Sequence, residues 1–337
     1  MTDQNANQES IPGSKHDRFL PVTIRRSRFT AGIVLSGLLF WHVGWFIAGP
    51  AAPHQTFSLM GWGANPIIPA VGLLFLLIIA AVAAMAITHA DTPHAGQFCA
   101  LLGLGALAIR GGTIYPLLRI ADDATTIHSV YQTLAQECAI WAAILVLAEL
   151  VTARIHAKFF ANTLWMERVA QDPEAFRMGL LTHLSPGAAG LAGDMARAQA
   201  EKLKKGAAKP MNAVLANVLA LLLGCLVASL LLPVFMQSQG KGQVLFAAFI
   251  SFGLAGFLAN LVLAQSNAWP ILLCVPITAA LGYFRAKGAL DYPGFSATSY
   301  ARSLPIDYIA AGVPGALYGY YGSVRLRLSH LFEPDDQ

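Results

Sequence analysis

Charged residues are scarce in this chain of 337 amino acids. Asp, Glu, Lys and Arg make up only 12% of it, which is about half of their usual share in soluble proteins. Hydrophobic residues make up 56%, and the mean hydropathy is +0.56. This composition excludes a disordered chain, a coiled coil and a water-soluble globule. A polytopic membrane protein remains.

Cysteine is also scarce, and the familiar catalytic motifs are missing. The four cysteines lie in apolar runs without a CxxC or Cys/His metal spacing, which favours small buried hydrophobic residues. Asp122 and Asp123 are not followed by a second acidic cluster. There is no GxSxG, HExxH, Walker A or haem-ligand pattern. We therefore expect no catalytic residue, no metal and no cofactor, and the chain does not look like an enzyme.

The apolar runs predict an all-α, polytopic transmembrane helix bundle of about eight spans, with seven as the alternative. Most runs approach the roughly 20 residues that a helix needs to cross a bilayer. The last two are shorter and contain prolines. The predicted spans are 31–49, 66–88, 96–118, 133–152, 211–235, 244–265, 269–284 and 305–321.

Basic residues predict the orientation. With eight spans and a cytoplasmic N-terminus, the inside segments hold 16 Lys and Arg and the outside segments hold 5. This bias favours cytoplasmic termini in a plasma (inner) membrane of bacterial type. Because the basic residues lie in loops and form no stripe with aromatics, we expect no nucleic-acid binding. The predicted divisions are a cytoplasmic tail (1–29), spans one to four (30–152), a cytoplasmic helical segment (153–210), spans five to eight (211–321) and a cytoplasmic tail (322–337).

The segment 153–210 divides the spans into four plus four. Residues 153–170 alternate apolar and basic positions, which predicts an amphipathic extension of span four or a helix on the membrane surface. Residues 194–205 predict a short charged helix. The third span of each half is rich in Gly and Pro, and interrupted helices at matching places in two halves are typical of transporter sites.

Ionisable residues inside the predicted spans are the candidate site, because such residues are costly in a bilayer and tend to be functional. Counted along the helices, three of them share a depth of about 12–13 Å from the outer end. These three are His42, Arg110 and Glu137. Asp307 lies nearer the outer face, Tyr115 is close to Arg110 in sequence, and Glu149 lies near the inner end of span four.

Two interpretations of this group remain open. In the first, Arg110 and Glu137 line a hydrated pocket that opens outward, with His42 as a proton-responsive member. In the second, Arg110 and Glu137 form a structural ion pair between adjacent helices.

The last span carries a packing pattern. Small residues recur at every fourth position, which predicts a ridge that another backbone can approach closely. The ridge consists of Ala311, Gly315, Gly319 and Ser323. Its partner is either a helix of the same chain or another subunit. Tyr318, Tyr320 and Tyr321 are expected on the other faces as an aromatic anchor.

Together these features suggest transport or conduction of a small solute or ion through the bundle. The intramembrane charges and the interrupted helices favour this function. The alternative is a non-catalytic scaffold or anchoring subunit of a larger membrane complex, which the absence of catalytic motifs and the small-residue ridge favour. The expected partners are the lipid bilayer and other membrane subunits or a second copy of the chain.

Overall fold

The protein is an all-α helix bundle, as the sequence predicts. The computed structural model describes residues 19–50, 56–60, 65–88, 93–120, 124–159, 213–238, 240–263, 268–288 and 302–331. The first half contains α1 (Phe19–Leu39), the π-helix η1 (Phe40–Gly44), α2 (Trp45–Ala48), α3 (Ile67–Thr88), α4 (Pro93–Arg110), α5 (Tyr115–Ile120) and α6 (Ala124–Phe159). The second half contains α10 (Ala213–Phe235), α11 (Lys241–Leu263), α12 (Trp269–Gly288), α13 (Pro305–Asp307), the π-helix η3 (Tyr308–Gly312) and α14 (Val313–Leu331).

Seven helices of the described chain are long and apolar enough to cross a membrane. The eighth predicted span is the continuous run of α13, η3 and α14 from Pro305 to Leu331. Residues 305–317 of this run are all buried, so protein rather than lipid surrounds that part of the helix. A helix shielded in this way can consist largely of Ala, Gly and Tyr, which explains its lower hydropathy.

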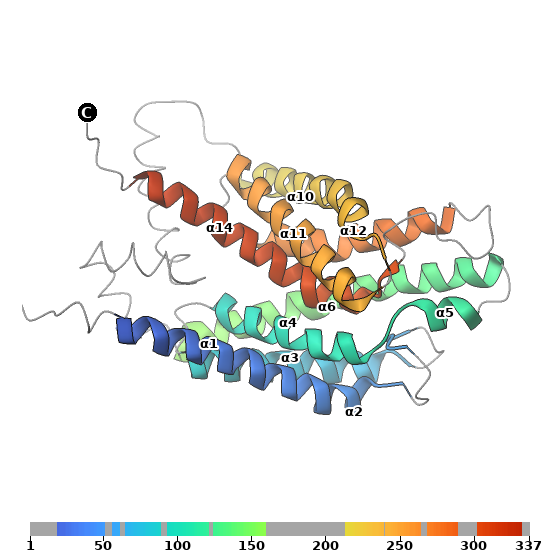
Figure 1. Ribbon diagram of the computed structural model, residues 1–337, viewed down its shortest axis with the longest axis horizontal. Helices are drawn as coiled ribbons and strands as arrows, with labels where there is room; N and C mark the ends of the chain where they lie inside the picture. The colour runs from blue at the N-terminus through green and yellow to red at the C-terminus, as the bar shows by residue number, and fades with distance from the viewer. Residues whose placement is uncertain are drawn as a thin grey trace, which may run out of the picture.

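The helices run between two ends of the bundle (Figure 1). At one end α2, α4 and α10 finish and α3, α11 and α13 begin; we call it the Gly112 end. At the other end α3, α6 and α11 finish and α4, α10 and α12 begin; we call it the Thr88 end.

The two halves meet along one surface, which we call the seam. It is formed by α6 against α12 and by α4 against α13, η3 and α14. Within the first half α1, α3 and α4 contact one another, and within the second half α11 lies between α10 and α14. Buried residues from both halves form one continuous apolar cluster, so the seam is part of the core.

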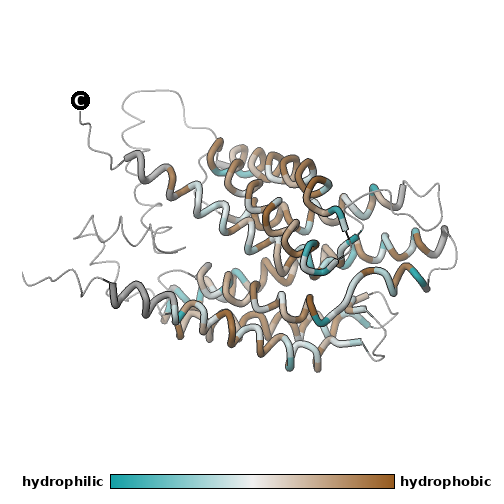
Figure 2. The backbone as a smooth tube through the Cα atoms, in the orientation of Figure 1, coloured by the Kyte–Doolittle hydropathy of each residue, from teal (hydrophilic) through white to brown (hydrophobic). Residues whose placement is uncertain are grey.

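The outer faces of the bundle are apolar, as a lipid environment requires. Large side chains such as Phe46, Phe75, Leu222 and Leu230 are exposed, and exposed apolar surface on this scale marks an interaction with membrane or protein. Figure 2 shows hydrophobic residues along the middle of the helices and hydrophilic residues mainly near their ends.

The third span of the first half and the third span of the second half differ in structure. In the first half α4 ends at Arg110, and a turn with Gly112 at a φ of +73° separates it from α5. A glycine with positive φ directly after a helix is a common C-terminal cap. In the second half α12 continues through Pro276 without a break. The suggested match between interrupted helices in the two halves is therefore wrong.

The segment after span four lies mostly outside the described residues. Helix α6 continues to Phe159, seven residues past the predicted end of the span, in the place where the sequence predicts an amphipathic extension. The remainder of the predicted segment, with its charged helix at 194–205, is not among the described residues.

Candidate functional site

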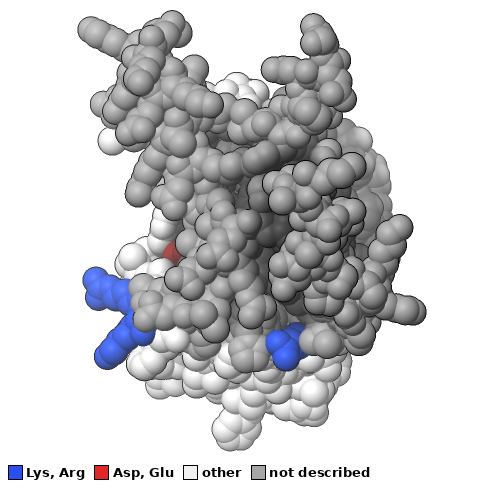
Figure 3. Space-filling model, turned by 90° about the vertical axis from the view of Figure 1, so that its left-hand side faces the viewer, with Lys and Arg blue, Asp and Glu red and all other residues white. Residues whose placement is uncertain are grey.

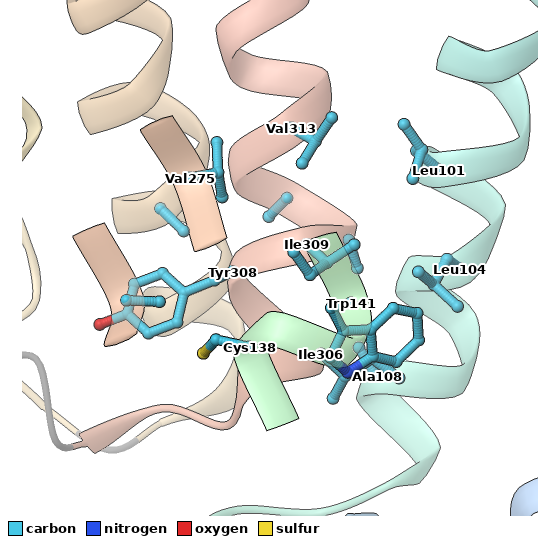
Figure 4. Packing of buried hydrophobic residues seen from close by; sticks show 14 of the residues in the cluster. Leu101, Leu104, Ala108, Cys138, Trp141, Val275, Ile306, Tyr308, Ile309 and Val313 are labelled. Carbon is cyan, nitrogen blue, oxygen red and sulfur yellow. The ribbon is translucent and has the colours of Figure 1, made fainter. Parts of the chain in front are cut away.

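The middle of the seam is a layer of buried apolar side chains. Leu104 and Ala108 of α4 face Ile309 of η3, and Trp141 of α6 lies beside them (Figure 4). Each of these four side chains is buried. Three ionisable side chains, Glu137, Glu149 and Asp307, are buried on either side of this layer.

Glu137 is completely buried near the Gly112 end, on α6. One carboxylate oxygen, Oε2, accepts hydrogen bonds from the Ser58 hydroxyl at 2.5 Å and from the Leu59 amide at 3.1 Å. The other oxygen accepts from the Trp141 indole at 3.3 Å. The Met60 amide is a further donor, and together these hydrogen bonds compensate for the lost hydration of the carboxyl group.

All donors to Glu137 except Trp141 come from a segment at the Gly112 end, residues 56–60. The Phe57 amide donates to the Gly111 carbonyl at 2.9 Å, and the Thr56 hydroxyl donates to the Thr113 carbonyl at 2.7 Å. Phe57 is fully buried. The break after α4 exposes the carbonyls that this segment binds, so the glycine turn positions the donors of Glu137.

Asp307 is the second buried acid near the Gly112 end, 1% exposed at the end of α13. Its carboxylate lies 2.5 Å from the Lys241 ammonium and also accepts from the Leu304 amide at 3.0 Å. Lys241 donates to the Gly112 carbonyl at 2.5 Å as well. One ammonium group therefore joins the start of α11, the short helix α13 and the turn after α4.

Buried aromatic rings fill the space around these acids. Tyr283 of α12 stacks on Tyr131 of α6, and its ring meets the edge of Tyr308 in η3. The Tyr283 hydroxyl donates to the Ser303 carbonyl at 2.6 Å. These rings connect the two halves of the chain, and the Tyr283 hydroxyl has a hydrogen-bond partner, as buried tyrosines usually do.

A cavity lies between the halves on the Thr88 side of the apolar layer. Residues of α3, α4, α6, α12 and α14 line it, among them Gln97, Glu149, Trp269 and Leu272. It leaves about 20 Å³ for the centre of a water molecule, which is room for about one water. Glu149 is 4% exposed, and the Gln97 amide donates to the Thr152 hydroxyl at 2.9 Å. The cavity thus combines a buried carboxylate and a buried amide in an apolar wall.

The structure does not bring Arg110 and Glu137 together. Glu137 accepts hydrogen bonds from Ser58, Leu59 and Trp141, among others, whereas the Arg110 guanidinium donates to the Trp41 carbonyl at 2.5 Å. The count that placed Arg110 nine residues inside a span assumed one helix through residue 118. Helix α4 ends at Arg110, so this residue lies at a helix end and not nine residues inward.

The other predicted site residues also lie in different places, either buried in the seam or exposed. Asp307 lies in the seam with Glu137, whereas His42 is exposed in η1 and Tyr115 is 55% exposed at the start of α5. The structure therefore separates a buried acidic group in the seam from a group on the outer face that contains His42, Arg110 and Tyr115.

The small-residue ridge of the last span lies against α11 of the same chain. A Cβ atom added at Gly319 would overlap the Gly253 carbonyl, and one at Gly315 would overlap the Phe249 carbonyl. At the end of the ridge the Asn260 amide donates to the Ser323 hydroxyl at 2.6 Å. Ala311, the first residue of the ridge, is buried. The expectation for Tyr320 is wrong, since this ring is buried rather than on an outer face.

Sequence reasoning missed Ser58, Gln97 and Lys241, and it left Glu149 outside the site. Ser58 and Lys241 lie in predicted loops, where a polar residue carries no signal. Gln97 lies one residue inside a predicted span, and an amide at a span end is ordinary. For Glu149 the sequence did offer a signal, because a carboxylate inside a predicted span can mark a functional site. Among the described residues, no group of three or more His, Cys, Asp or Glu side chains could hold a metal ion.

The fold and the buried acids define an integral, polytopic membrane protein of the helix-bundle class. No protein-family model, curated protein or solved structure matches the chain. Its function is therefore argued from its own residues.

Proposed function

We propose that the protein transports a small cation, with the proton as the first candidate, along the seam between its two halves. The observation that carries this proposal is Glu149, a buried carboxylate that lines a cavity between the halves. Ionisable residues inside a membrane usually mark ion pathways and proton relays. Substrate sites of many transporters likewise lie between two structural halves.

The spacing of the acids supports a pathway with two sites. Glu137 and Glu149 are twelve residues apart on the continuous helix α6, which corresponds to about 18 Å along its axis. The apolar layer around Trp141 and Ile309 separates them. Passage of a cation from one acid to the other would therefore require the halves to rearrange and open this layer.

The π-helix η3 gives the seam a place to rearrange. It follows Asp307 directly and contacts α4, α11 and α12. Short π-helical turns inside α-helices are frequent at functional sites. Gly312 ends this turn, and a Cβ there would lie 2.7 Å from the Phe252 ring and 2.9 Å from the Val275 side chain. Only a glycine lets η3 lie this close to its neighbours.

The proposal includes an orientation, with the Thr88 end in the cytoplasm of a bacterial-type cell. The 16-to-5 distribution of basic residues supports it. Arg28, Arg154 and Lys158 are exposed at this end. Figure 3 looks onto this end and shows blue Lys and Arg side chains in two places on this face.

Flux through purified protein tests the proposal. The full chain is reconstituted into liposomes that contain a pH-sensitive dye, and the decay of an imposed pH gradient is compared with that in empty liposomes. Parallel gradients of Na⁺ and K⁺ identify the ion. We expect decay well above the empty-liposome rate for at least one of the three. Rates equal to empty liposomes for all three would refute cation transport.

A scaffold subunit is the second candidate, and one observation favours it. The two halves share one continuous apolar core, while α10 presents a row of exposed apolar residues that includes Leu222, Leu226 and Leu230. Such a face fits another membrane helix as well as lipid. Absence of flux together with co-purification of a second membrane subunit in mild detergent would select this function.

A further inference from the structure

Arg110 forms a clamp with two tryptophans on the outer face of the bundle. Its guanidinium carbon lies 4.5 Å from the centre of the Trp45 ring and 5.3 Å from that of the Trp41 ring. One terminal nitrogen donates to the Trp41 carbonyl at 2.5 Å. Cation–π contacts of this kind hold a guanidinium in place without neutralising its charge.

The charge of Arg110 has no counter-ion in the described part of the chain. No described carboxylate lies within ion-pair distance, and Glu137 accepts its hydrogen bonds from other donors. A guanidinium has five N–H donors, and the bond to Trp41 uses one. The remaining donors of this half-buried side chain are available to an anion that approaches along the outer face.

The position of the clamp points to the source of that anion. Helix α4 ends at Arg110 and α2 ends three residues after Trp45, so the clamp lies at the edge of two membrane spans. The residues beside it, Phe46 and Ile109, are apolar and exposed, which makes this surface lipid-facing. Tryptophans at such an edge lie at the level of the lipid headgroups.

We propose that Arg110 binds the headgroup phosphate of an anionic phospholipid. The guanidinium donors bind the phosphate oxygens, which Arg does in a bidentate manner. The acyl chains lie along the apolar side chains next to the clamp. The site is separate from the seam, so it does not depend on the proposed transport function.

Lipid-dependent thermal stability tests this proposal. The full chain in a neutral detergent is titrated with short-chain phosphatidylglycerol, with phosphatidylcholine, or with glycerol 3-phosphate as the free phosphate. We expect phosphatidylglycerol to raise the unfolding temperature of the wild type more than the other two. The Arg110→Gln variant should bind phosphatidylglycerol about fivefold more weakly, as expected for one basic residue at a membrane surface.

Arg119→Gln is the matched control, because Arg119 is exposed on the neighbouring α5 and carries the same charge. It should respond to phosphatidylglycerol like the wild type. If Arg110→Gln does not fold, Trp45→Leu replaces it, and the loss of the stacked ring should also weaken lipid binding. Three results would each overturn the proposal. The clamp variant could respond to phosphatidylglycerol like the wild type, or Arg119→Gln could lose as much lipid binding as the clamp variant. Glycerol 3-phosphate could also raise the unfolding temperature of the wild type as much as phosphatidylglycerol does.

Discussion

The Lys241 ammonium lies 2.5 Å from the Asp307 carboxylate and the same distance from the Gly112 carbonyl. It thereby ties the second half of the chain to the turn that follows α4 in the first half. Because the side chains of Lys241 and Asp307 are only 15% and 2% exposed, this ion pair is largely shielded from water. Transport along the seam would have to loosen this contact at the Gly112 end.

The first prediction concerns this ion pair. Lys241→Met and Asp307→Asn should each destabilise the protein, since removal of one partner from a buried pair costs about 3–5 kcal/mol in soluble proteins. The double variant should lose less stability than the two single variants lose together. The unfolding temperatures of the four proteins in one detergent measure the coupling. Strict additivity would show that the pair contributes nothing.

The second prediction concerns the contact between α14 and α11. Gly319→Ala should destabilise the protein by about 1–3 kcal/mol through overpacking, because its Cβ would overlap the Gly253 carbonyl. Gly322→Ala is the matched control on the same helix, where the nearest Phe257 ring atom is 3.6 Å from the added Cβ. The free energy of unfolding of this variant should be unchanged or higher by up to about 1 kcal/mol. Equal thermal stability of the two variants would mean that the helices do not pack as described.

The third prediction compares two possible partners of Glu137. A double-mutant cycle with Ser58→Ala and Glu137→Gln should give a coupling of about 0.5–3 kcal/mol, because their side chains share a partly buried hydrogen bond. The cycle with Arg110→Gln and Glu137→Gln should give a coupling near zero, since the two side chains bind different partners. A larger coupling in the Arg110 cycle than in the Ser58 cycle would support the ion pair between Arg110 and Glu137 that the sequence suggests.

The fourth prediction concerns topology. Ser238→Cys at the Gly112 end and Lys158→Cys at the Thr88 end both place a thiol at an exposed position. In intact bacterial cells a membrane-impermeant maleimide should label the first variant only. The wild type controls for the native cysteines, of which Cys99, Cys138 and Cys274 are buried. Labelling of Lys158→Cys without labelling of Ser238→Cys would reverse the orientation.

Composition and hydropathy predict the fold well because each span is a local property of about twenty residues. Spans 66–88 and 211–235 agree with α3 and α10 to within two residues at either end. The end of α4 was missed because Tyr115, Leu117 and Leu118 continue the apolar run past the Gly111–Gly112 turn. Hydropathy reports whether a segment can lie in lipid, and it does not report whether that segment is one helix.

The candidate site was predictable only in part, because contacts between distant residues leave no local pattern. The acids Glu137 and Asp307 stand out as costly residues in apolar runs, and both are buried in the seam. Their partners Ser58 and Lys241 lie 79 and 66 residues away in sequence, in predicted loops. The cavity beside Glu149 requires five helices to meet, which sequence spacing alone does not reveal.

The most direct test of the proposed transport compares Glu149→Gln with the wild type in the liposome assay. The substitution removes the carboxylate from the cavity and keeps its size nearly unchanged. Glu201→Gln makes the same chemical change in the predicted cytoplasmic segment, and equal amounts of folded protein in each sample are verified by size-exclusion chromatography. We expect cation flux of Glu149→Gln to fall to the empty-liposome rate, while Glu201→Gln retains the wild-type rate. Wild-type flux in folded Glu149→Gln would contradict a cation pathway through the seam.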